Sequence, residues 1–391
     1  TSPSTFSNGV ITFRYTVVAT GGVTGFTTPV TGLPGNHVIA DVLHNPTDAP
    51  QTVAYTIYPV NPSPLCAEGP PKVVVITVNP TPQVVPVVVA GTLCNDGTTG
   101  ITLTSPSTFS NGLITFNYTV VATGGVTGFI TPVTGLPRNH VIADILHNPT
   151  DSPQTVTYTI VPISPSGCAA GPSKIVVITV NPTPQVVPST LAQTLCNDGT
   201  TNVTLGSPST FTSGVITFNY TVVATGGVTG FTSPVTGLPR DYIISDVLHN
   251  PTDAPQTVTY TVVPISPTGC AAGPSKVVVI TVNPTPQVVP STLAQTICND
   301  GTTSVTLGSP STFSNGLITF NYTVVATGGV TGFTTPVTGL PRNHVIADVL
   351  HNPTDAPQTV TYTIVPISPT GCAAGPPKVV VITVNPTPQV V

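Results

Sequence analysis

The stretch Leu-Ile-Thr-Phe-Asn-Tyr-Thr-Val-Val-Ala-Thr, residues 317–327, decides the fold class of this chain. Apolar side chains stand at every second position of it: Ile318, Phe320, Tyr322 and Val324. The residues between them are polar: Thr319, Asn321 and Thr323. Alternation with period 2 is typical of an antiparallel strand that has one buried face. The stretch therefore predicts a β-strand, and the Gly-Gly pair that follows predicts a turn after it.

The same stretch recurs along the chain. Its flanking motif Ser-Pro-Ser-Thr-Phe begins at Ser2, Ser105, Ser207 and Ser309. The spacing of about 100 residues is longer than that of solenoid repeats and matches a whole domain. We therefore divide the chain into a first repeat (1–85), a second (86–187), a third (188–289) and a fourth (290–391). The first has no counterpart of residues 86–103, so we interpret the sequence as a window cut from a longer array.

Within the fourth repeat, short apolar segments alternate with Pro-, Gly- and Asn-rich turns. The predicted strands are 291–297, 304–307, 317–327, 344–350, 358–365 and 378–385. The run 379–382 is apolar throughout, which indicates a strand buried on both sides. A tight turn is predicted at Asn299–Gly301. Six or seven short strands in about 100 residues predict an Ig-like antiparallel β-sandwich, so the expected fold class is all-β.

Composition supports this class and excludes others. The 391 residues include 46 Pro and only 5% charged residues, but 39% are hydrophobic, which is enough for each repeat to bury a core. The net charge is -5, with no basic patch for nucleic acid. The longest apolar runs fall far short of the ~18 residues of a membrane span, so no membrane insertion is expected in this segment.

Successive repeats are joined by the linker Asn-Pro-Thr-Pro-Gln-Val-Val, as in residues 181–187. Two prolines in four residues favour an extended, semi-rigid spacer. With strands that rise ~3.3 Å per residue, four repeats in line would form an extended rod on the order of 100–160 Å long.

Cysteine occupies two positions of the repeat. The first position holds Cys94, Cys196 and Cys298, and the second holds Cys66, Cys168, Cys270 and Cys372. A bridge could cross each linker or close each repeat. The last strand ends at the linker, so the second cysteine, which precedes that strand, lies at the opposite pole from the linker. A linker-crossing bridge would then span far more than the ~7 Å between Cα atoms that a disulfide allows.

We therefore predict bridges within repeats, namely Cys94–Cys168, Cys196–Cys270 and Cys298–Cys372, with Cys66 unpaired in this window. Each would close a loop of about 75 residues and contribute roughly 4 kcal/mol by the chain-entropy argument. No CxxC spacing indicates zinc. Disulfides indicate an oxidising compartment, so the protein is expected to be secreted or on the cell surface.

Other polar motifs have simpler interpretations than a catalytic or metal site. Asp144, His147 and Asp151 share a loop that could attract calcium, but Asn-Pro and Thr-Asp are turn formers and each repeat holds too few carboxylates. No nucleophile motif accompanies the recurring histidine. We expect no catalytic residue, no metal and no cofactor, and therefore no enzyme.

Three further alternatives concern the surface. Asn-X-Thr sequons begin at Asn117, Asn202, Asn219 and Asn321, although Arg14 replaces the asparagine in the first repeat. The Thr155, Thr157 and Thr159 ladder could suit ice binding, and is equally a good strand surface. The lysine that opens each last strand, such as Lys174, could form an isopeptide bond, or could guard a strand against edge pairing.

The segments 348–354, 358–364, Gly371-Cys372 and 378–386 resemble the PKD-like, Ig-like modules of giant surface proteins in Bacteroidota. Those chains carry many such modules and are exported to the cell surface. The resemblance covers every repeat. It implies a PKD-like fold and the role of a stalk or an adhesin shaft, and it supplies no active site.

The expected function is a structural shaft of an extracellular fibre or cell-surface adhesin stalk, in which disulfide-locked repeats act as stiff spacers. Its expected partners are further copies of the same repeat in a longer chain. Two alternatives stay open at this point: a repeat array that itself binds glycans or surfaces, and an array that packs with its own kind into a filament. A binding array should expose a cluster of aromatic side chains on each repeat.

Overall fold

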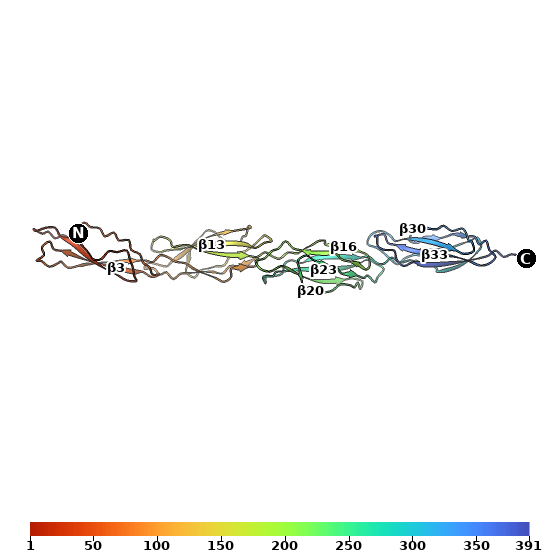
Figure 1. The fold of residues 1–391 in the computed structure, drawn as a ribbon, viewed down its shortest axis with the longest axis horizontal. Helices are drawn as coiled ribbons and strands as arrows, with labels where there is room; N and C mark the ends of the chain where they lie inside the picture. Colours follow the sequence, from red (N-terminus) through yellow and green to blue (C-terminus); the bar gives the residue numbers. More distant parts are fainter. Residues whose placement is uncertain (391) are drawn as a thin grey trace. The chain divides into compact units, whose positions relative to one another are not determined.

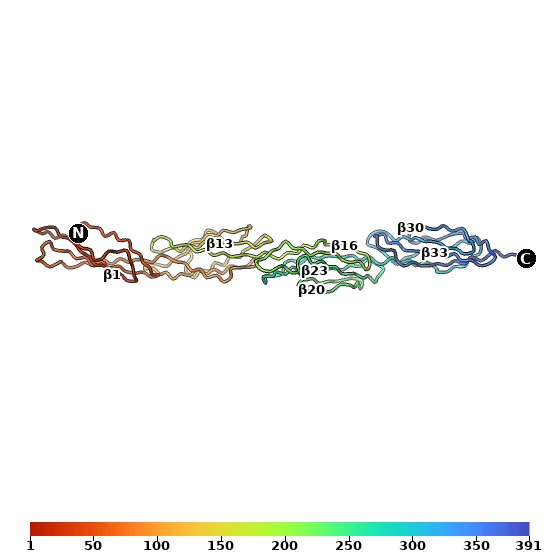
Figure 2. Tube along the Cα trace, in the orientation of Figure 1, coloured from red at the N-terminus to blue at the C-terminus, as the bar shows by residue number. Residues whose placement is uncertain are grey.

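The computed structural model describes residues 1–390, and the regular elements in that range are all β-strands (Figure 1). The chain forms two compact units, Thr1–Pro182 and Thr183–Val391. The first unit holds the first and second repeats, and the second unit holds the third and fourth. In Figure 2 the third repeat (green) leads into the fourth (blue). No sheet contains strands from both of these repeats.

The strands of the fourth repeat are β25 (Val289–Pro290), β26 (Ala294–Cys298), β27 (Gly301–Thr302), β28 (Val305–Gly308), β29 (Thr319–Ala326), β30 (Val337–Pro341), β31 (Val345–Ile346), β32 (Val349–Leu350), β33 (Gln358–Ile367) and β34 (Lys378–Asn385). Those of the third repeat are β15 (Val187–Pro188), β16 (Ala192–Leu195), β17 (Gly199–Thr200), β18 (Val203–Gly206), β19 (Thr217–Ala224), β20 (Val235–Pro239), β21 (Tyr242–Ile244), β22 (Val247–Leu248), β23 (Gln256–Ile265) and β24 (Lys276–Val282).

The second repeat has the same order of strands, β5 (Val85–Val88), β6 (Thr92–Leu93), β7 (Gly97–Thr98), β8 (Ile101–Thr104), β9 (Thr115–Ala122), β10 (Val133–Pro137), β11 (Val141–Ile142), β12 (Ile145–Leu146), β13 (Gln154–Ile163) and β14 (Lys174–Val180). The first repeat contributes four, β1 (Thr12–Ala19), β2 (Val30–Leu33), β3 (Gln51–Val60) and β4 (Lys72–Val78).

Each complete repeat is a two-layer sandwich. In the fourth repeat, one layer is the five-stranded sheet β26-β34-β33-β29-β30. The other layer consists of the three-stranded sheet β25-β28-β31 and the two-stranded sheet β27-β32. Every pairing is antiparallel except that of β26 with β34, which is parallel. The second and third repeats have the same topology, which confirms the predicted all-β, Ig-like fold class.

The core lies between the two layers, and strand alternation fills it. Ile318, Phe320, Tyr322 and Val324 are all buried, as the sequence predicts. Val288, at the end of the linker, is also buried in the core of the fourth repeat, and Val84 is buried in the same way in the second. The linker therefore supplies a core residue to the repeat that follows it.

Two predictions about strands are wrong in detail. The segment predicted as one strand over 344–350 is interrupted, because β31 pairs with β28 whereas β32 pairs with β27. The apolar run 379–382 is buried on one face only: Val380 and Ile382 are in the core, whereas Val379 is about half exposed. The continuous apolar run thus forms a strand between β26 and β33 that has one buried face and carries valine on its outer face.

The predicted turns are confirmed where backbone geometry requires them. Asp300, in the Asn-Asp-Gly turn, has a φ of 63°. Gly332, in the Gly-Gly-Val-Thr-Gly segment, has a φ of 94°, and a Cβ there would lie 1.9 Å from the carbonyl oxygen of Val349. That close approach allows the isolated bridge between Thr331 and His351.

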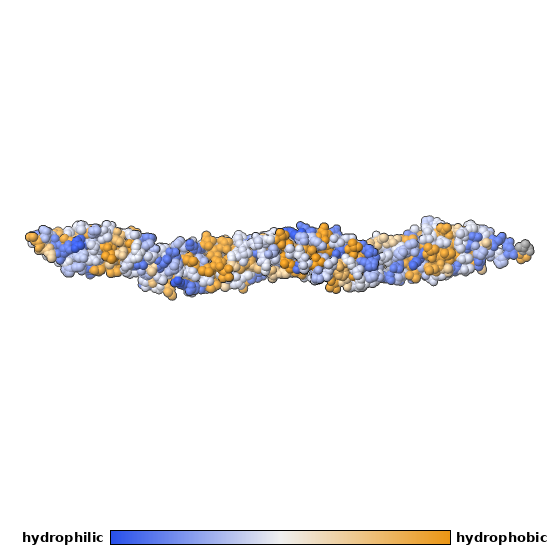
Figure 3. Space-filling view, turned by 60° about the horizontal axis from the view of Figure 1, so that its bottom comes forward, coloured by the Kyte–Doolittle hydropathy of each residue, from blue (hydrophilic) through white to orange (hydrophobic). Residues whose placement is uncertain are grey.

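The first repeat contains only the sheet β2-β1-β3-β4. Its core cluster consists of five buried residues, namely Tyr15, Val17, Val23, Val53 and Tyr55. An apolar groove of about 300 Å³, lined in part by Tyr15, Ile39, Ile57 and Val74, lies on this sheet. In the second repeat the equivalent sheet is covered by the other layer of the sandwich, which contains β8. The exposed apolar side chains elsewhere form separate areas among polar surface on the face seen in Figure 3.

Candidate functional site at the junction between repeats

The first cysteine of a repeat follows the strand that pairs in parallel with the last strand. In the third repeat, β16 runs alongside β24 with Leu195 opposite Val282, so Cys196 lies beside the start of the linker. In the fourth repeat Cys298 lies opposite Asn385, which is the equivalent position. The first cysteine is therefore at the C-terminal pole of its own repeat.

Hydrogen bonds hold this pole together around Cys196. The amide of Asn197 donates from Nδ2 to Thr285 Oγ1 in the linker (3.0 Å), and its Oδ1 accepts from the Asn250 N–H (2.6 Å). Asp198 pairs with His249 (Oδ1–Nδ1 2.8 Å). The Asn-Asp-Gly turn after Cys196 thus connects three segments of the chain.

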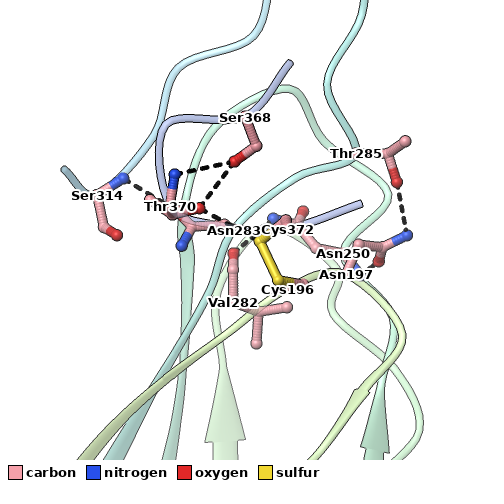
Figure 4. The surroundings of a disulfide bond; sticks show 10 residues. All are labelled: Cys196, Asn197, Asn250, Val282, Asn283, Thr285, Ser314, Ser368, Thr370 and Cys372. Carbon is pink, nitrogen blue, oxygen red and sulfur yellow. Dashed lines mark hydrogen bonds between the residues drawn. A yellow bond between two sulfur atoms is a disulfide. The ribbon is translucent and has the colours of Figure 1, made fainter. Parts of the chain in front are cut away.

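The second cysteine lies at the other pole. Cys372 stands in the loop between the end of β33 and the start of β34, so it faces the preceding repeat. The hydroxyl of Thr370 contacts the Cys372 sulfur at 3.2 Å and the Ser368 hydroxyl at 2.8 Å, as Figure 4 shows. Backbone and side-chain hydrogen bonds within the Ser368-Pro-Thr-Gly-Cys372 turn shape this loop.

These two cysteines are joined. Cys196 of the third repeat forms a disulfide with Cys372 of the fourth, with the Cα atoms 5.4 Å apart and 176 residues between them in sequence (Figure 4). Cys94 and Cys270 are also disulfide-bonded. Cys66, Cys168 and Cys298 are free and exposed. The site is a covalent staple across the junction between neighbouring repeats.

The predicted bridges within repeats, Cys94–Cys168, Cys196–Cys270 and Cys298–Cys372, are therefore wrong. The second cysteine does lie at the pole opposite the linker. The first cysteine does not lie at that pole as predicted, because the strand before it runs parallel to the last strand. The linker-crossing alternative, such as Cys168–Cys196, is not what forms either.

The junction around the staple is hydrogen-bonded as well. Asn283 Oδ1 accepts from the Ser314 N–H (2.9 Å). The Gln287 N–H in the linker donates to the Ser311 hydroxyl (3.0 Å). The carbonyl of Asp253 accepts from the Thr312 N–H (2.8 Å). The Ser-Pro-Ser-Thr-Phe-Ser motif of the fourth repeat thus binds the end of the third repeat through two backbone N–H groups and the Ser311 hydroxyl.

The linker itself is packed. Asn283, Pro284 and Pro286 are buried, so the linker is a docked segment and not a solvated spacer. Gly375 lies directly against it: a Cβ at Gly375 would lie 1.7 Å from the Pro286 carbonyl oxygen. The Asn283 Nδ2 is buried without a hydrogen-bond partner among the described residues. The junction therefore requires a glycine at position 375 for steric reasons.

The first unit repeats this arrangement. Asn79 Oδ1 accepts from the Ser110 N–H (3.1 Å), and the Gln83 N–H donates to Ser107 Oγ (3.1 Å). A Cβ at Gly171 would lie 1.8 Å from the Pro82 carbonyl oxygen. Here Cys168 takes the place of Cys372 but is free. The non-covalent junction therefore forms without a disulfide.

Sequence reasoning did not single out these junction residues. The signal was available, because the Ser-Pro-Ser-Thr-Phe motif and a glycine three residues after the second cysteine recur in every repeat. What the sequence did not show is that both segments face the preceding linker. That information lies in the path of the chain over the end of the sandwich.

The histidine and aspartate candidates have structural roles at the same pole. His147 pairs with Asp96 (2.9 Å), and His351 pairs with Asp300 (3.0 Å), so each histidine connects its loop to the turn after the first cysteine. Among residues 1–390, no group of three or more His, Cys, Asp or Glu side chains is placed to hold a metal ion.

The other surface candidates lie on the sheets. The amide of Asn117 connects β9 to β10, because its Oδ1 accepts from the Gly135 N–H (2.9 Å). In the first repeat Arg14 pairs instead with Glu68 (Nε–Oε1 2.7 Å). Thr155, Thr157 and Thr159 share the outer face of β13, and Lys174 is exposed at the start of β14.

The described part of the chain has no helix long and apolar enough to cross a membrane.

One ionisable pair lies inside each sandwich. The Tyr158 hydroxyl donates to Asp144 Oδ2 (2.8 Å), and Tyr362 donates likewise to Asp348 (2.6 Å). Burial, together with this bond to a carboxylate, raises the pKa of Tyr158 and of Tyr362 far above its ordinary value. Burial also raises the pKa of Asp144, although the Tyr158 hydroxyl opposes that shift.

Among solved structures, the chain is similar in part to the following three. Mouse cadherin-23 EC22–24 is 15% identical, with 79% of this chain and 99% of that chain covered and a TM-score of 0.36. The human desmocollin-1 ectodomain is 13% identical, with 97% and 75% covered and a TM-score of 0.30. Titin domains I67–I69 are 10% identical, with 78% and 99% covered and a TM-score of 0.38.

No curated protein sequence matches the chain. The PKD-like domain family matches four segments, residues 3–82, 91–184, 193–286 and 295–388, and these cover most of the sequence. The matched segments follow the repeat found in the sequence, and each ends in the linker. The chain therefore belongs to the PKD-like domain family and carries four tandem copies of its domain.

Proposed function

We propose that this chain is the structural shaft of an extracellular fibre or cell-surface adhesin stalk, and that its four domains are the repeats 1–85, 86–187, 188–289 and 290–391. The observation that carries the proposal is the disulfide between Cys196 and Cys372, which joins two neighbouring domains. A disulfide that persists favours an oxidising compartment outside the cytoplasm.

The position of the staple suits a protein under tension. The covalent path from Cys196 to Cys372 bypasses the 176 residues between them. A pulling force applied at the two ends of the chain would pass through the sulfur atoms, so most of the third and fourth domains would be shielded from unfolding. A bridge within one domain would shield that domain alone and would leave each linker unprotected.

The non-covalent junction adds stiffness to the proposed shaft. The docked linker, the three hydrogen bonds around Ser311, Thr312 and Ser314, and the contact at Gly375 all restrict how one domain bends on the next. A linker without such contacts would act as a flexible tether.

The rival function, an array that binds glycans, requires exposed aromatic side chains. Phe116, Tyr118 and Tyr158 are buried, and Phe109 and Phe129 pack against the core of the second domain. Among the exposed large apolar side chains of residues 1–390, the aromatic one is Phe6. The aromatic residues therefore support the sandwich, and no surface feature favours the rival.

Single-molecule stretching tests the proposal. The sample is a full-length variant in which every cysteine except Cys196 and Cys372 is replaced by serine, pulled from its two ends. Because 176 residues are released when the bridge is reduced, the fully stretched length should increase by about 600 Å on adding a thiol reductant.

A variant without any cysteine is the matched control, and its stretched length should not respond to reductant. A gain close to zero in the two-cysteine chain would show that the staple does not carry the force. That outcome would remove the basis for a tension-resisting shaft.

A further inference from the structure

The second repeat differs from the third in how its first segment passes from one layer of the sandwich to the other. In the third repeat, β15 ends at Pro188, and β16 then pairs with β24 from Val279 onward. In the second repeat, β5 stays paired with β8 over Val85–Val88, and β6 joins β14 only from Thr179 onward. Thr179 corresponds to Thr281, two positions after Val279, so the edge of β14 is covered over a shorter length.

This later start leaves the backbone of Val177 uncovered at the edge of β14. In the third repeat the equivalent N–H, that of Val279, donates to the Leu191 carbonyl oxygen (3.0 Å). The counterpart of Leu191 in the second repeat is Val89, whose own N–H is bonded to the Gly100 carbonyl in the other layer (3.0 Å). Within residues 1–390 the Val177 N–H has no hydrogen-bond partner, so it is a free donor on an open strand edge.

An apolar groove of about 410 Å³ lies beside this edge. It is lined in part by Pro86 and Val88 of β5 and by Ile175 and Val177 of β14, so both layers of the sandwich contribute to it. Val177 is 49% exposed there, whereas its counterpart Val279 is partly buried. A groove of this size accommodates a short peptide segment.

The surface beside the groove is apolar where the other repeats are polar. Val87 and Val88 stand where the third repeat has Ser189 and Thr190, and the fourth repeat also has serine and threonine there. The side chains of Val87 and Val89 are more than half exposed. Exposed apolar side chains that are specific to one repeat, next to a free strand edge, favour contact with another polypeptide.

Lys174 gives the groove a positive charge. It lines the groove, is exposed, and takes part in no ion pair of the described chain. In the third repeat Ala192 lies opposite Val279, and extending this pairing backwards places Ser189 opposite the lysine that begins β24. A segment bound in the same way would therefore meet Lys174 three residues before its alanine, and a carboxylate there would pair with the ammonium group.

We propose that the second repeat binds an extended segment of a partner protein, which adds to the open edge of β14 as a parallel strand. The segment would present a carbonyl group to the Val177 N–H, small apolar side chains to Val88, and a carboxylate to Lys174. Main-chain bonds supply affinity in this mode of recognition, and side-chain contacts supply specificity. The equivalent edge is covered in the third and fourth repeats, so the partner would attach to the second.

Hydrogen exchange on the full-length chain tests the site. The probe is an acetylated and amidated peptide, Asp-Thr-Leu-Ala-Gln, which copies residues 189–193 with an aspartate at the position that would face Lys174. In excess, it should slow exchange of the Val177 amide about tenfold, because that N–H gains a partner. The Val279 amide is the internal control, since it is already bonded and should not respond.

Two matched comparisons separate strand addition from nonspecific contact. A peptide with an N-methyl group on its leucine nitrogen keeps every side chain, but it cannot approach the strand edge and should give no protection. A protein variant gives the second repeat the covering segment of the third, and its substitutions are Val87→Ser, Val88→Thr, Val89→Leu and Gly91→Gln. Its own chain should then cover Val177, so that amide should exchange slowly without peptide and should not respond to it.

Lys174→Ala should weaken binding of the peptide by up to about fivefold, as expected for one exposed ion pair. An unchanged Val177 exchange rate in excess peptide would overturn the proposal, as would equal slowing by the N-methylated peptide. A Val177 amide as slow as that of Val279 without peptide would also overturn it, because the chain's own residues would then close the edge. Slowing that depends on protein concentration alone would assign the edge to a second copy and would contradict a separate partner.

Discussion

A tyrosine and an aspartate form an ionisable contact in each of the four repeats. The hydroxyls of Tyr55, Tyr158, Tyr260 and Tyr362 each donate to an aspartate at 2.6–2.8 Å. A phenolate next to a carboxylate in a buried place is strongly disfavoured. The folded state therefore requires these tyrosines to stay protonated.

This requirement sets an alkaline limit on stability. Burial raises the pKa of Tyr220 to about 12, and burial with the aspartate bond raises that of Tyr362 further. A pKa above its unfolded value of about 10 contributes stability that is complete below pH ~10 and is lost as the pH rises through the folded value. We expect circular dichroism and phenolate absorbance to change together above about pH 10.

Replacing Tyr362 with phenylalanine tests the assignment, since it removes one of the phenols that must stay protonated in the fourth repeat. Tyrosines that ionise at ordinary pKa values while the circular dichroism spectrum stays constant would contradict the buried pairing.

Replacing the two cysteines of the Cys196–Cys372 bridge with serine removes the disulfide and leaves the strands of the sandwich unchanged. We expect the Cys196→Ser/Cys372→Ser double variant to unfold its third and fourth repeats at lower temperature, with a loss of roughly 5 kcal/mol by the chain-entropy argument, because a long loop is no longer closed in the unfolded chain. Calorimetry of the full chain measures the change, and Cys298→Ser is the control because Cys298 is free. Equal transitions in the double variant and the control would refute it.

Among the structural elements, the linker decides how one sandwich meets the next. Its prolines remove backbone donors. The Asn283 side chain and the Gln287 N–H bind the segment Ser309–Ser314 of the next repeat, and Pro286 packs against the loop after the second cysteine. Pro286 lies so close to Gly375 that no side chain fits between them.

We expect Gly375→Ala to open this junction. Gly375 has no positive φ, so the variant adds a clash of 1.7 Å with the Pro286 oxygen and no backbone strain. Overpacking of this kind costs about 1–3 kcal/mol. Hydrogen exchange should show a faster-exchanging Ser314 amide, which bonds to Asn283 in the native junction.

The control is Gly91→Ala, where the added Cβ would meet nothing within 4 Å. Ser314 protection that is the same in both variants would show that the linker can shift without loss.

At the scale of the whole molecule, the four repeats differ in how complete their cores are. The core cluster of the first repeat contains five buried apolar residues. The clusters of the other three repeats also contain residues from the second layer of the sandwich and from the preceding linker. Val74 and Ile76 are exposed in β4, although their counterparts Val176 and Ile178 are buried in β14.

Sequence alone determined the period, the all-β class and the strands that form one face of the core. The buried positions of β29 follow from local alternation, because a period of 2 specifies a strand wherever one side is buried. The strand at Lys378–Asn385 follows from its apolar run, although that run did not show which face is buried. The turns at Asp300 and Gly332 follow from residues that tolerate positive φ.

Only the tertiary structure decided where the first cysteine lies. Periodicity says that 291–297 is extended, but not which edge it joins or in which direction, since those choices depend on contacts with β34 more than 80 residues later. The parallel pairing of β26 with β34 carries the cysteine to the C-terminal pole. That single long-range choice turns a bridge expected within one repeat into a staple between two.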